Sequence, residues 1–518
     1  MTTQITPIPQ VDIPWTRATG TPVVGKDILE LLSSSMYINP MTIYREYVQN
    51  AADAIDEARR VGTLGSSTPG RVEINIDYGN RAIRIRDNGT GVDGNEFVTR
   101  LTSFGASAKR GERSRGFRGV GRLSGIGYCQ ELVFRSRGNE EDLVSELRWD
   151  CRRIKTILRS ADFVGDLANL LKQTVETRTI QGRGWPEHFF EVELRGIVRH
   201  GNDCLLNPAA IENYLSQVAP VPFCPEFRFG KELESVLSAH VALGNVEITI
   251  AGMGEPVYRP YRNRFEIANG VFDEFSKLEF TRVPAVDGGT AALGWVLHHG
   301  YKGAIPPRTK IKGLRLRRGN MQVGEDDLME DLFPEPRFNS WSVGEVHVVD
   351  DRIVPNGRRD HFEQNVHYNN LVNHISPVAR AISNLCRTNS LRRNWLREFE
   401  RQKSLAMDTI AIIRQGTLSS PMRKEMELKI KDAISEMERI SGREQLAMES
   451  AGALCPAVRV VRRQLARIEG TNHRAKHLEK MPAHKRRVYE HVFGLIYECS
   501  PNPAAAKGLV DRIMTRLS

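Results

Sequence analysis

The sequence predicts an α/β protein in three parts: an α/β sandwich with helices on one face of a sheet, a second mixed α/β region, and a helical C-terminal region. Three observations support this class. Apolar residues recur at helical spacing over 26–60, the runs 72–76 and 83–85 alternate apolar and charged residues, and one apolar stripe follows 422–440. A helix, paired strands, a loop and further strands in this order are typical of a sheet covered on one side.

The composition is that of an ordinary globular chain, and it narrows the classes of function. The 518 residues are 40% hydrophobic and 26% charged, and no apolar run reaches the roughly 20 residues that a membrane helix needs. No basic segment followed by an apolar core opens the chain, so no secretory signal is expected. The seven cysteines form no CxxC pair, which argues against a zinc site and favours a cytoplasmic location.

The first part, residues 1–220, is expected to hold the sheet and its covering helices. The helical pattern over 26–60 is interrupted at Asn39 and Pro40, where a helix break is expected. Alternating apolar residues predict half-buried strands. This alternation predicts strands at 72–76 and 83–85, and strand-like runs follow at 130–136 and 189–194. The stretch 102–125 is rich in Gly, Ser and Arg, and it predicts a mobile loop that ends in a helix.

Two further parts follow. Residues 221–375 form the second mixed region, with strand candidates at 246–251 and 343–350. Residues 376–518 are expected to be helical and hold 27 Lys and Arg against 15 Asp and Glu, a net charge of +12. The rest of the chain is almost neutral. Such a tail could meet nucleic acid or an acidic partner, or simply present solvated helix faces.

One helix of this tail can be placed closely. Ser420 as N-cap and Pro421 in the first turn are typical of a helix start, and Gly442 is a plausible end. The apolar residues between them lie on one stripe. A stripe of this kind is more often a core or a dimer seam than a ligand groove.

Three local patterns carry the candidate chemistry, and the first is helical. Glu46, Asn50 and Asp53 are spaced by four and three residues, which places two carboxylates and an amide on one face of the helix. A wet helix surface would show the same spacing, so this pattern needs support from the others.

The second pattern follows a strand. Asp87 stands at the end of the run AIRIR, and Gly89 and Gly91 come directly after it. A carboxylate there can accept a hydrogen bond from an exocyclic amine such as that of adenine, and the glycines allow close backbone approach. Asp-Asn-Gly is also ordinary turn chemistry, which is the competing interpretation.

The third pattern is a glycine loop before a helix. Gly116, Gly119 and Gly121 precede the run Arg122–Ser124. Backbone N–H groups at the positive end of a helix favour phosphate. The loop is not of the Walker A type, because no Gly-Lys followed by Ser or Thr is present.

In this order and spacing, the three patterns resemble the GHKL superfamily of ATPases over about residues 15–200. This superfamily includes gyrase-type topoisomerases, the ninety-kilodalton heat-shock chaperones, sensor histidine kinases and MutL-type repair proteins. The helical stretch at 26–59 looks most like the chaperone. GFRG at 116–119 and Ser107–Lys109 look like the lid of MutL, whereas Gly119–Gly121 looks like the chaperone. The resemblance implies a Bergerat-type ATP-binding α/β sandwich followed by a transducer, or middle, domain.

The stretch 343–365 extends the match, because it resembles a segment of the chaperone's middle domain. There an Asn-x-x-Arg-acidic run supplies an arginine to the γ-phosphate of ATP. Asn356, Arg359 and Asp360 fit that run. Arg358 competes with Arg359 for the role.

The resemblance also implies a role for each residue of the first two patterns. Glu46 would be the general base that activates water, and a glutamate here favours hydrolysis over phosphotransfer. Asn50 would ligate Mg²⁺, and Asp53 would support the ribose or adenine side. Asp87 would read the adenine amino group. Gly89 and Gly91 would let the backbone approach the base.

The lid would hold the phosphates. Backbone N–H groups at Gly116, Gly119, Val120 and Gly121 would bind them, and Lys109 would add charge. Relatives close over ATP as dimers, so the resemblance implies a homodimer whose lid orders when the γ-phosphate is present.

Two features depart from the family pattern. The Gly-Thr pair that precedes the last sheet strand in the superfamily is absent from the run 184–194. The resemblance therefore assigns no adenine contact to this run. The second part is shorter than the chaperone's middle segment, and the chaperone's acidic linker and acidic C-terminal peptide have no counterpart.

Two functions follow from these features. The first is an Mg²⁺-dependent, chaperone-like ATPase whose dimeric clamp closes on a protein client in the cytoplasm. The second is a nucleic-acid clamp akin to MutL or the MORC family, in DNA repair or anti-phage defence, with phosphate contacts from two basic clusters. The clusters are Arg459, Arg462 and Arg463, and Lys485, Arg486 and Arg487. A sensor kinase is disfavoured by Glu46, and no membrane partner is expected.

Overall fold

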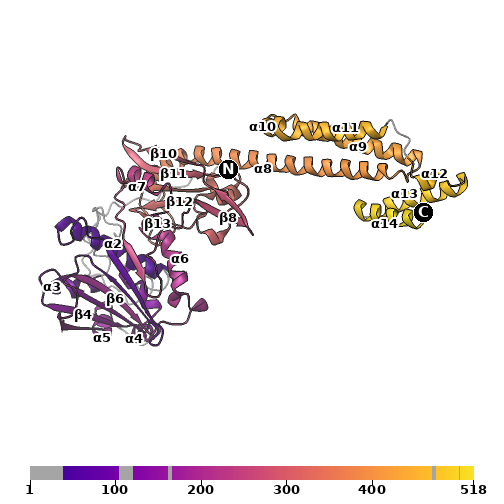
Figure 1. Ribbon diagram of the computed structural model, residues 1–518. Coiled ribbons are helices and arrows are strands. Elements are labelled where there is room, and N and C mark those ends of the chain that lie inside the picture. Colours follow the sequence, from indigo (N-terminus) through magenta and orange to yellow (C-terminus); the bar gives the residue numbers. More distant parts are fainter. Residues whose placement is uncertain (1–38, 104–120, 161–165, 470–473, 501, 518) are drawn as a thin grey trace, which may run out of the picture. The chain divides into compact units, whose positions relative to one another are not determined.

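The computed structural model describes residues 39–103, 121–160, 166–469, 474–500 and 502–517 (Figure 1). The described chain forms two compact units. The first runs to His298 and includes Ile305–Leu332 and Ser342–Ser376, and the second holds His299–Ala304, Phe333–Trp341 and the chain from Pro377 on. The units do not separate 1–220 from 221–375, so that division remains an interpretation of the sequence. None of the helices in the described residues is both long and apolar enough to cross a membrane.

The first unit is built on a seven-stranded sheet with strand order β5-β4-β3-β6-β2-β1-β7. Its strands are β1 (Arg71–Asp77), β2 (Ala82–Asp87), β3 (Glu131–Arg137), β4 (Leu143–Asp150), β5 (Val175–Gln181), β6 (Phe189–Arg195) and β7 (Glu247–Ile250). Neighbouring strands are antiparallel except β1 and β7, which are parallel. The α/β class is therefore confirmed, with β7 of the expected run 246–251 joining the first sheet.

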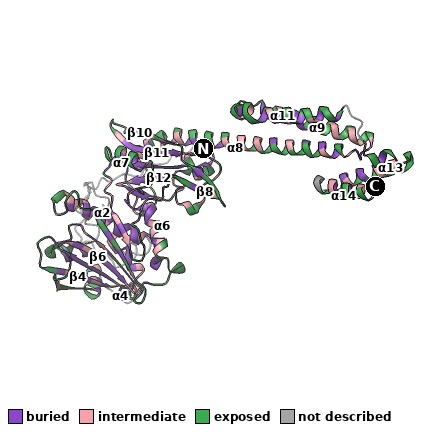
Figure 2. Cartoon of the chain, viewed as in Figure 1, coloured by how far each residue is buried: buried purple, intermediate pink, exposed green. Residues whose placement is uncertain are grey.

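Helices cover one face of this sheet. They are α2 (Thr42–Val61), α3 (Gly94–Thr102), α4 (Cys151–Arg159), α5 (Leu167–Thr174) and α6 (Pro208–Val218), with 3₁₀ segments η1 (Gly121–Gly127) and η2 (Gly201–Leu206). Figure 2 shows the buried residues gathered between helices and strands. Ile83 and Ile85 of β2 lie in this core, whereas Arg84 and Arg86 lie on the opposite face and pair with glutamates of β6. The strand alternation thus separates an apolar face from a charged one.

Helix α2 is the element on which the site is built. Its small residues Ala51 and Ala52 are buried, which lets the helix pack closely on the sheet. It ends at Gly62, which takes the left-handed conformation (φ 82°) that favours glycine. Arg59 and Arg60 lie in the last turn, where positive charge suits the helix dipole.

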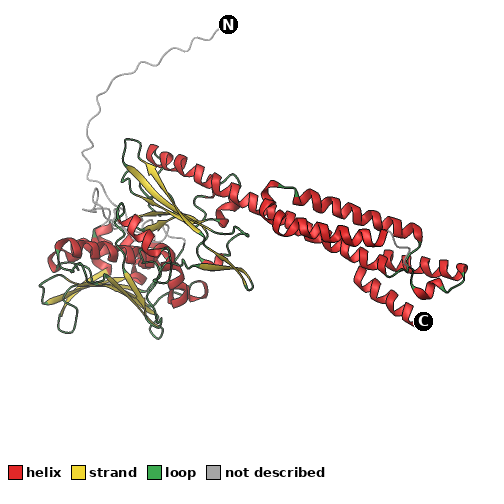
Figure 3. Ribbon diagram, turned by 45° about the horizontal axis from the view of Figure 1, so that its top comes forward, coloured by secondary structure: helices red, strands yellow, loops and turns green. Residues whose placement is uncertain are grey.

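The second α/β part of this unit contains a five-stranded sheet with order β10-β11-β14-β12-β13. Its strands are β10 (Lys277–Pro284), β11 (Thr290–His298), β12 (Gly313–Arg318), β13 (Met321–Val323) and β14 (Val343–Val348). The hairpin β8 (Arg264–Ala268) and β9 (Val271–Glu274) and the helix α7 (Gly230–Ser238) complete it. Figure 3 shows the two sheets as separate sets of strands.

Helix α8 (Val366–Arg414) runs from the first unit into the second, which is helical as expected. The other helices are α9 (Ser420–Ser441), α10 (Ala447–Glu449), α11 (Cys455–Glu469), α12 (Lys476–Glu479), α13 (Ala483–Cys499) and α14 (Pro503–Leu517). The N-cap of α9 is Ser419, one residue before the expected one. Ile430, Ile434 and Met437 of the apolar stripe are buried in the core of this unit, so the stripe is core.

Candidate functional site

Helix α2 presents the three polar residues that its spacing predicts. Glu46 and Asp53 are only 5% and 7% exposed, and Asn50 is half-buried. Buried carboxylates on a helix are unusual unless they have partners or a function. The burial therefore argues against the interpretation of this face as a wet surface.

The Glu46 carboxylate faces two guanidinium groups. Arg45 Nη2 lies 3.2 Å from Glu46 Oε1, and Arg359 Nε lies 3.8 Å from the same oxygen. Arg45 Nη2 also donates to the carbonyl of Arg358 at 3.1 Å. Arg358 itself is exposed, whereas the Arg359 side chain is 12% exposed. Of the two competing arginines, Arg359 is the one that the fold brings to the α2 carboxylate.

A tight hairpin presents Arg359. Pro355 and Phe362 form a β-bridge, and the Asn356 N–H donates to the His361 carbonyl at 2.9 Å. Arg359 has a φ of 58°, a conformation that side chains other than glycine rarely adopt. The Gly324 N–H donates to its carbonyl at 2.9 Å and helps to hold that conformation.

Asp87 ends β2 and is 6% exposed. Its Oδ1 accepts a hydrogen bond from the Gly89 N–H at 2.9 Å. Burial raises the pKa of Asp87 from 3.8 to about 7, although hydrogen bonds from the backbone N–H groups of Gly89 and Phe190 oppose the shift. Strongly shifted pKa values gather at functional sites, so the buried Asp87 carboxyl is a candidate to bind a polar group of a ligand.

The two glycines after Asp87 lie so close to neighbouring atoms that a larger residue would overlap them. A Cβ on Gly89 would lie 2.6 Å from Ala54 Cβ on α2. Gly91 has a φ of 68°, and a Cβ there would overlap the Arg137 carbonyl oxygen. The loop therefore lies directly against α2, which brings Asp87 and the α2 face into one neighbourhood.

One residue of this neighbourhood was missed by the sequence analysis. His188 Nδ1 lies 2.7 Å from the Gly89 carbonyl oxygen. The only signal was its place in the run 184–194, which lacks the expected Gly-Thr pair.

The described part of the lid reaches Glu46. A Cβ on Gly121 would overlap Glu46 Oε2, so the backbone at the start of η1 lies against the carboxylate. The Tyr47 hydroxyl donates to the Arg122 carbonyl at 3.1 Å and accepts from the Gly125 N–H at 3.1 Å, which ties η1 to α2. The other predicted lid residues lie outside the described residues. They are Lys109, Gly116, Gly119 and Val120.

The donor set on α2 fits Mg²⁺ in kind. Glu46, Asn50 and Asp53 offer carboxylate and amide oxygens, and Mg²⁺ takes one or two such ligands beside phosphate and water. In the described ranges, no group of three His, Cys, Asp or Glu side chains is placed to hold a metal ion.

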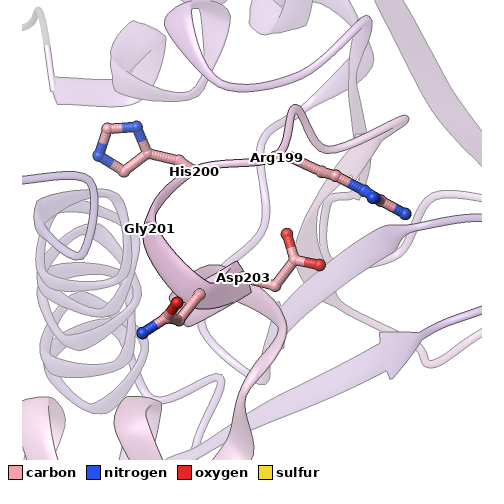
Figure 4. A pocket seen from close by; sticks show the side chains of 5 residues that line it. Arg199, His200, Gly201 and Asp203 are labelled. Atoms are coloured by element: carbon pink, nitrogen blue, oxygen red, sulfur yellow. The ribbon is translucent and has the colours of Figure 1, made fainter.

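A separate hollow lies on the loop 199–203 (Figure 4). It is lined by Arg199, His200, Gly201, Asn202 and Asp203. Arg81 donates two hydrogen bonds to the Asp203 carboxylate, at 2.8 and 3.0 Å. None of the candidate residues lines this hollow, so it is not part of the candidate site.

The two basic clusters lie on α11 and α13 of the helical unit. Arg462 pairs with Glu438, and Arg486 is half-buried. The exposed members are Arg459, Arg462, Arg463, Lys485 and Arg487.

Comparisons with known proteins match the first α/β part. Residues 39–168 match the family described as histidine kinase-, DNA gyrase B- and HSP90-like ATPase. The chaperone protein HtpG of Acinetobacter baylyi is 28% identical over 139 residues, which is 24% of this chain and 22% of that protein. HtpG of Campylobacter jejuni subsp. doylei is 32% identical over 92 residues, 17% of this chain and 15% of that protein.

A further match covers more residues of the chain. HtpG of Francisella tularensis subsp. novicida is 26% identical over 208 residues, 35% of this chain and 31% of that protein. The chain thus spans less than a third of the length of these relatives. The segment that resembles MutL, 107–119, lies outside the described residues. Residues 39–168 thus match a GHKL-type ATPase domain, and the chain is distantly similar to the HtpG chaperones.

Proposed function

We propose that this chain is an Mg²⁺-dependent ATPase that hydrolyses ATP to ADP and phosphate, and that it uses the cycle to close a homodimeric clamp on a protein client. One observation supports hydrolysis most directly. Glu46 and Arg359, which come from two different α/β parts of the first unit, meet within 3.8 Å. Glu46, the proposed general base, lies within the residues 39–168 that match the ATPase family, and the contact brings a cation to it.

Glu46 is proposed to accept the proton of the attacking water. Its burial beside the start of η1 excludes bulk solvent, and Arg45 and Arg359 fix the direction of the carboxylate. Arg359 is proposed to contact the γ-phosphate as negative charge is redistributed in the transition state. Its position beside Glu46 would place the charged guanidinium close to both water and phosphate.

The other α2 and loop residues are proposed to bind the nucleotide. Asn50 would hold Mg²⁺, which would supply positive charge to the phosphates. Asp53 supports the ribose or adenine side, and Asp87 accepts from the adenine amino group. Gly89 and Gly91 allow the backbone to approach the base. Gly121 would contribute a backbone N–H to the phosphates, as would Gly116, Gly119 and Val120 of the lid, and Lys109 would add positive charge.

Steady-state Mg²⁺-ATP hydrolysis of the full chain tests this proposal. Glu46→Ala should bind a fluorescent ATP analogue with nearly unchanged affinity and hydrolyse ATP at least about 100-fold more slowly, since a general base contributes roughly 10²–10⁴-fold. Asn50→Ala should lose Mg²⁺-dependent binding. Hydrolysis by Glu46→Ala at the wild-type rate would show that the base is elsewhere.

The client side of the proposal rests on the similarity to the chaperone protein HtpG. Light scattering of the full chain with and without a non-hydrolysable ATP analogue tests the clamp. A dimer whose dimensions contract with the analogue supports it. A monomer under both conditions contradicts it.

A nucleic-acid clamp is the second candidate, and the exposed arginines of α11 favour it. Arg459 and Arg463 are one helical turn apart and exposed. ATP hydrolysis with and without double-stranded DNA, at two salt concentrations, separates the candidates. Stimulation that fades with salt supports this second candidate, because phosphate contacts release counterions. Hydrolysis indifferent to DNA leaves the chaperone-like proposal.

A further inference from the structure

Both backbone polar groups of Gly89 have partners, and these groups belong to the two peptide units that meet at its Cα. Its N–H donates to Asp87 Oδ1 at 2.9 Å, and its carbonyl oxygen lies 2.7 Å from His188 Nδ1. A carbonyl oxygen can only accept, so Nδ1 of His188 carries the proton in this contact. The distance is at the short end of the N–H···O range, which indicates a well-formed hydrogen bond.

Packing against helix α2 leaves little freedom for the backbone at Gly89 and Thr90. A Cβ on Gly89 would lie 2.6 Å from Ala54 Cβ and 2.7 Å from the Ala54 carbonyl carbon. The Thr90 N–H donates to the Ala54 carbonyl oxygen at 3.3 Å. Helix α2 therefore supports one side of the loop, and His188 provides a donor for the Gly89 carbonyl.

The position of His188 is fixed by the sheet. It directly precedes β6, which pairs antiparallel with β2 so that Asp87 lies opposite Phe190. The same strand pair thus carries the carboxylate at the end of β2 and the imidazole at the start of β6. The peptide unit 89–90, which His188 contacts, and the unit 88–89, whose N–H Asp87 accepts from, share the Gly89 Cα. A rotation of the first would therefore displace the N–H of the second, and the Asp87 carboxylate could then rotate.

We infer that His188 is a positioning residue of the adenine side: it holds the backbone at Gly89, and through the Gly89 N–H the Asp87 carboxylate, in the orientation that accepts a hydrogen bond from an exocyclic amine of the base. The inference rests on the proposed function. It assigns the run 184–194, which lacks the Gly-Thr pair, a contact of its own.

Three substitutions separate this role from plain loop stability. Asn places its side-chain N–H at the position of Nδ1 of histidine, Gln places it near the position of Nε2, and Ala removes it. His188→Asn should therefore preserve the contact, while His188→Gln and His188→Ala should lose it. Glu187→Ala is the matched control, because Glu187 is the exposed neighbour in the same loop.

The measurement is the dissociation constant of the full chain for ATP and for purine riboside triphosphate, which lacks the exocyclic amine. The wild type, His188→Asn and Glu187→Ala should prefer ATP. His188→Ala and His188→Gln should lose about tenfold of that preference, the size of one hydrogen bond to a charged group. A change in melting temperature alone would not alter the ratio of the two constants.

The outcomes are distinct. If the wild type prefers ATP and the Ala and Gln variants keep the same preference, His188 is a structural residue and the inference is overturned. If the wild type binds neither nucleotide, the proposed function fails and the inference fails with it. The inference is supported if His188→Ala and His188→Gln lose the preference for ATP and His188→Asn keeps it.

Discussion

Arg359 Nε lies 3.8 Å from Glu46 Oε1, and the hairpin 355–362 that carries the arginine also receives a hydrogen bond from Arg45 through the Arg358 carbonyl. The α2 carboxylate is thus tied to the second α/β part by side chain and by backbone. Two arginines that are adjacent in sequence have different environments, since Arg359 turns to Glu46 and Arg358 is exposed.

Arg359→Ala should lower the turnover number for ATP by about 100-fold or more, because a cation that contacts the transferring phosphoryl group acts mainly on the transition state. The affinity for ATP should change far less. Steady-state hydrolysis and equilibrium binding of a fluorescent ATP analogue measure the two effects separately.

Arg358→Ala is the matched control for this substitution. Its side chain is exposed, and its carbonyl, which Arg45 contacts, is kept in the variant. Turnover should remain within about twofold of the wild type, as for most surface substitutions. If Arg358→Ala were the slower enzyme of the two, the assignment of the catalytic arginine would have to be reversed.

The choice between these arginines shows what the sequence could not supply. The spacing of Glu46, Asn50 and Asp53 is local, so helical geometry alone predicted their shared face, and the burial of both carboxylates agrees with a special site. The direction of the Arg359 side chain depends on the left-handed backbone conformation of Arg359 itself (φ 58°) inside the hairpin. An arginine in the sequence does not predict that conformation, because residues other than glycine rarely adopt it.

Non-local pairing limited the fold prediction in the same way. The runs 130–136 and 189–194 match β3 and β6 within one residue, because both are short runs rich in strand-forming residues. β7 has only four residues, and its pairing with β1 comes from a distant part of the chain. The contact of His188 with Gly89 also depends on strand pairing, so no local pattern could indicate it.

Gly121→Ala should slow hydrolysis while leaving stability nearly unchanged. A Cβ there would overlap Glu46 Oε2, and the atom that can most easily move is the end of the glutamate side chain. The carboxylate would then leave its place beside Arg359. We expect about a tenfold loss of turnover or more, since a displaced catalytic group costs rate steeply. Steady-state hydrolysis and thermal melting of the same samples provide the test.

Gly254→Ala is the control for an added methyl group. A Cβ at Gly254 would meet no atom within 4 Å, and this glycine has no positive φ. Its turnover and its melting temperature should both match the wild type. Normal hydrolysis by Gly121→Ala would mean that Glu46 tolerates displacement, which would contradict its role as the base.

Asp87 should make stability depend on pH in an unusual direction. Burial raises the pKa of Asp87 to about 7, above its ordinary 3.8. Between these values the folded state holds the proton more tightly than the unfolded state, so stability falls as the pH rises from about 4 to 7 and is constant above that. The effect is at most about 4 kcal/mol by linkage.

Asp87→Asn tests this dependence, because the amide has no proton to lose in that range. Urea unfolding of the wild type and the variant at several pH values from 4 to 8 gives the two curves. The difference in free energy of unfolding, variant minus wild type, should increase with pH up to about 7. A difference that is flat across this range would show that the Asp87 carboxyl ionises in the folded protein as it does in water.

A buried network of charged side chains on β14 supports the α/β part that carries the hairpin 355–362. Glu345 of β14 is fully buried and contacts four side chains: Arg259, Arg317 (Nε to Oε1, 2.7 Å), Tyr261 (hydroxyl to Oε1, 3.0 Å) and His347 (Nε2 to Oε2, 3.1 Å). The two arginines hold the pKa of Glu345 well below its usual range, in spite of burial.

Glu345→Gln would leave two buried guanidinium groups without a negative partner, which costs about 3–5 kcal/mol when a buried pair is broken. Glu279→Gln is the matched control, because Glu279 also pairs with a cation, Lys277, but on the surface, where such pairs contribute about 0–1 kcal/mol. Urea unfolding should therefore show a large loss for the first variant and almost none for the second. Equal, small losses would mean that the buried arginines find other acceptors, and that the network orients β14 without stabilising it.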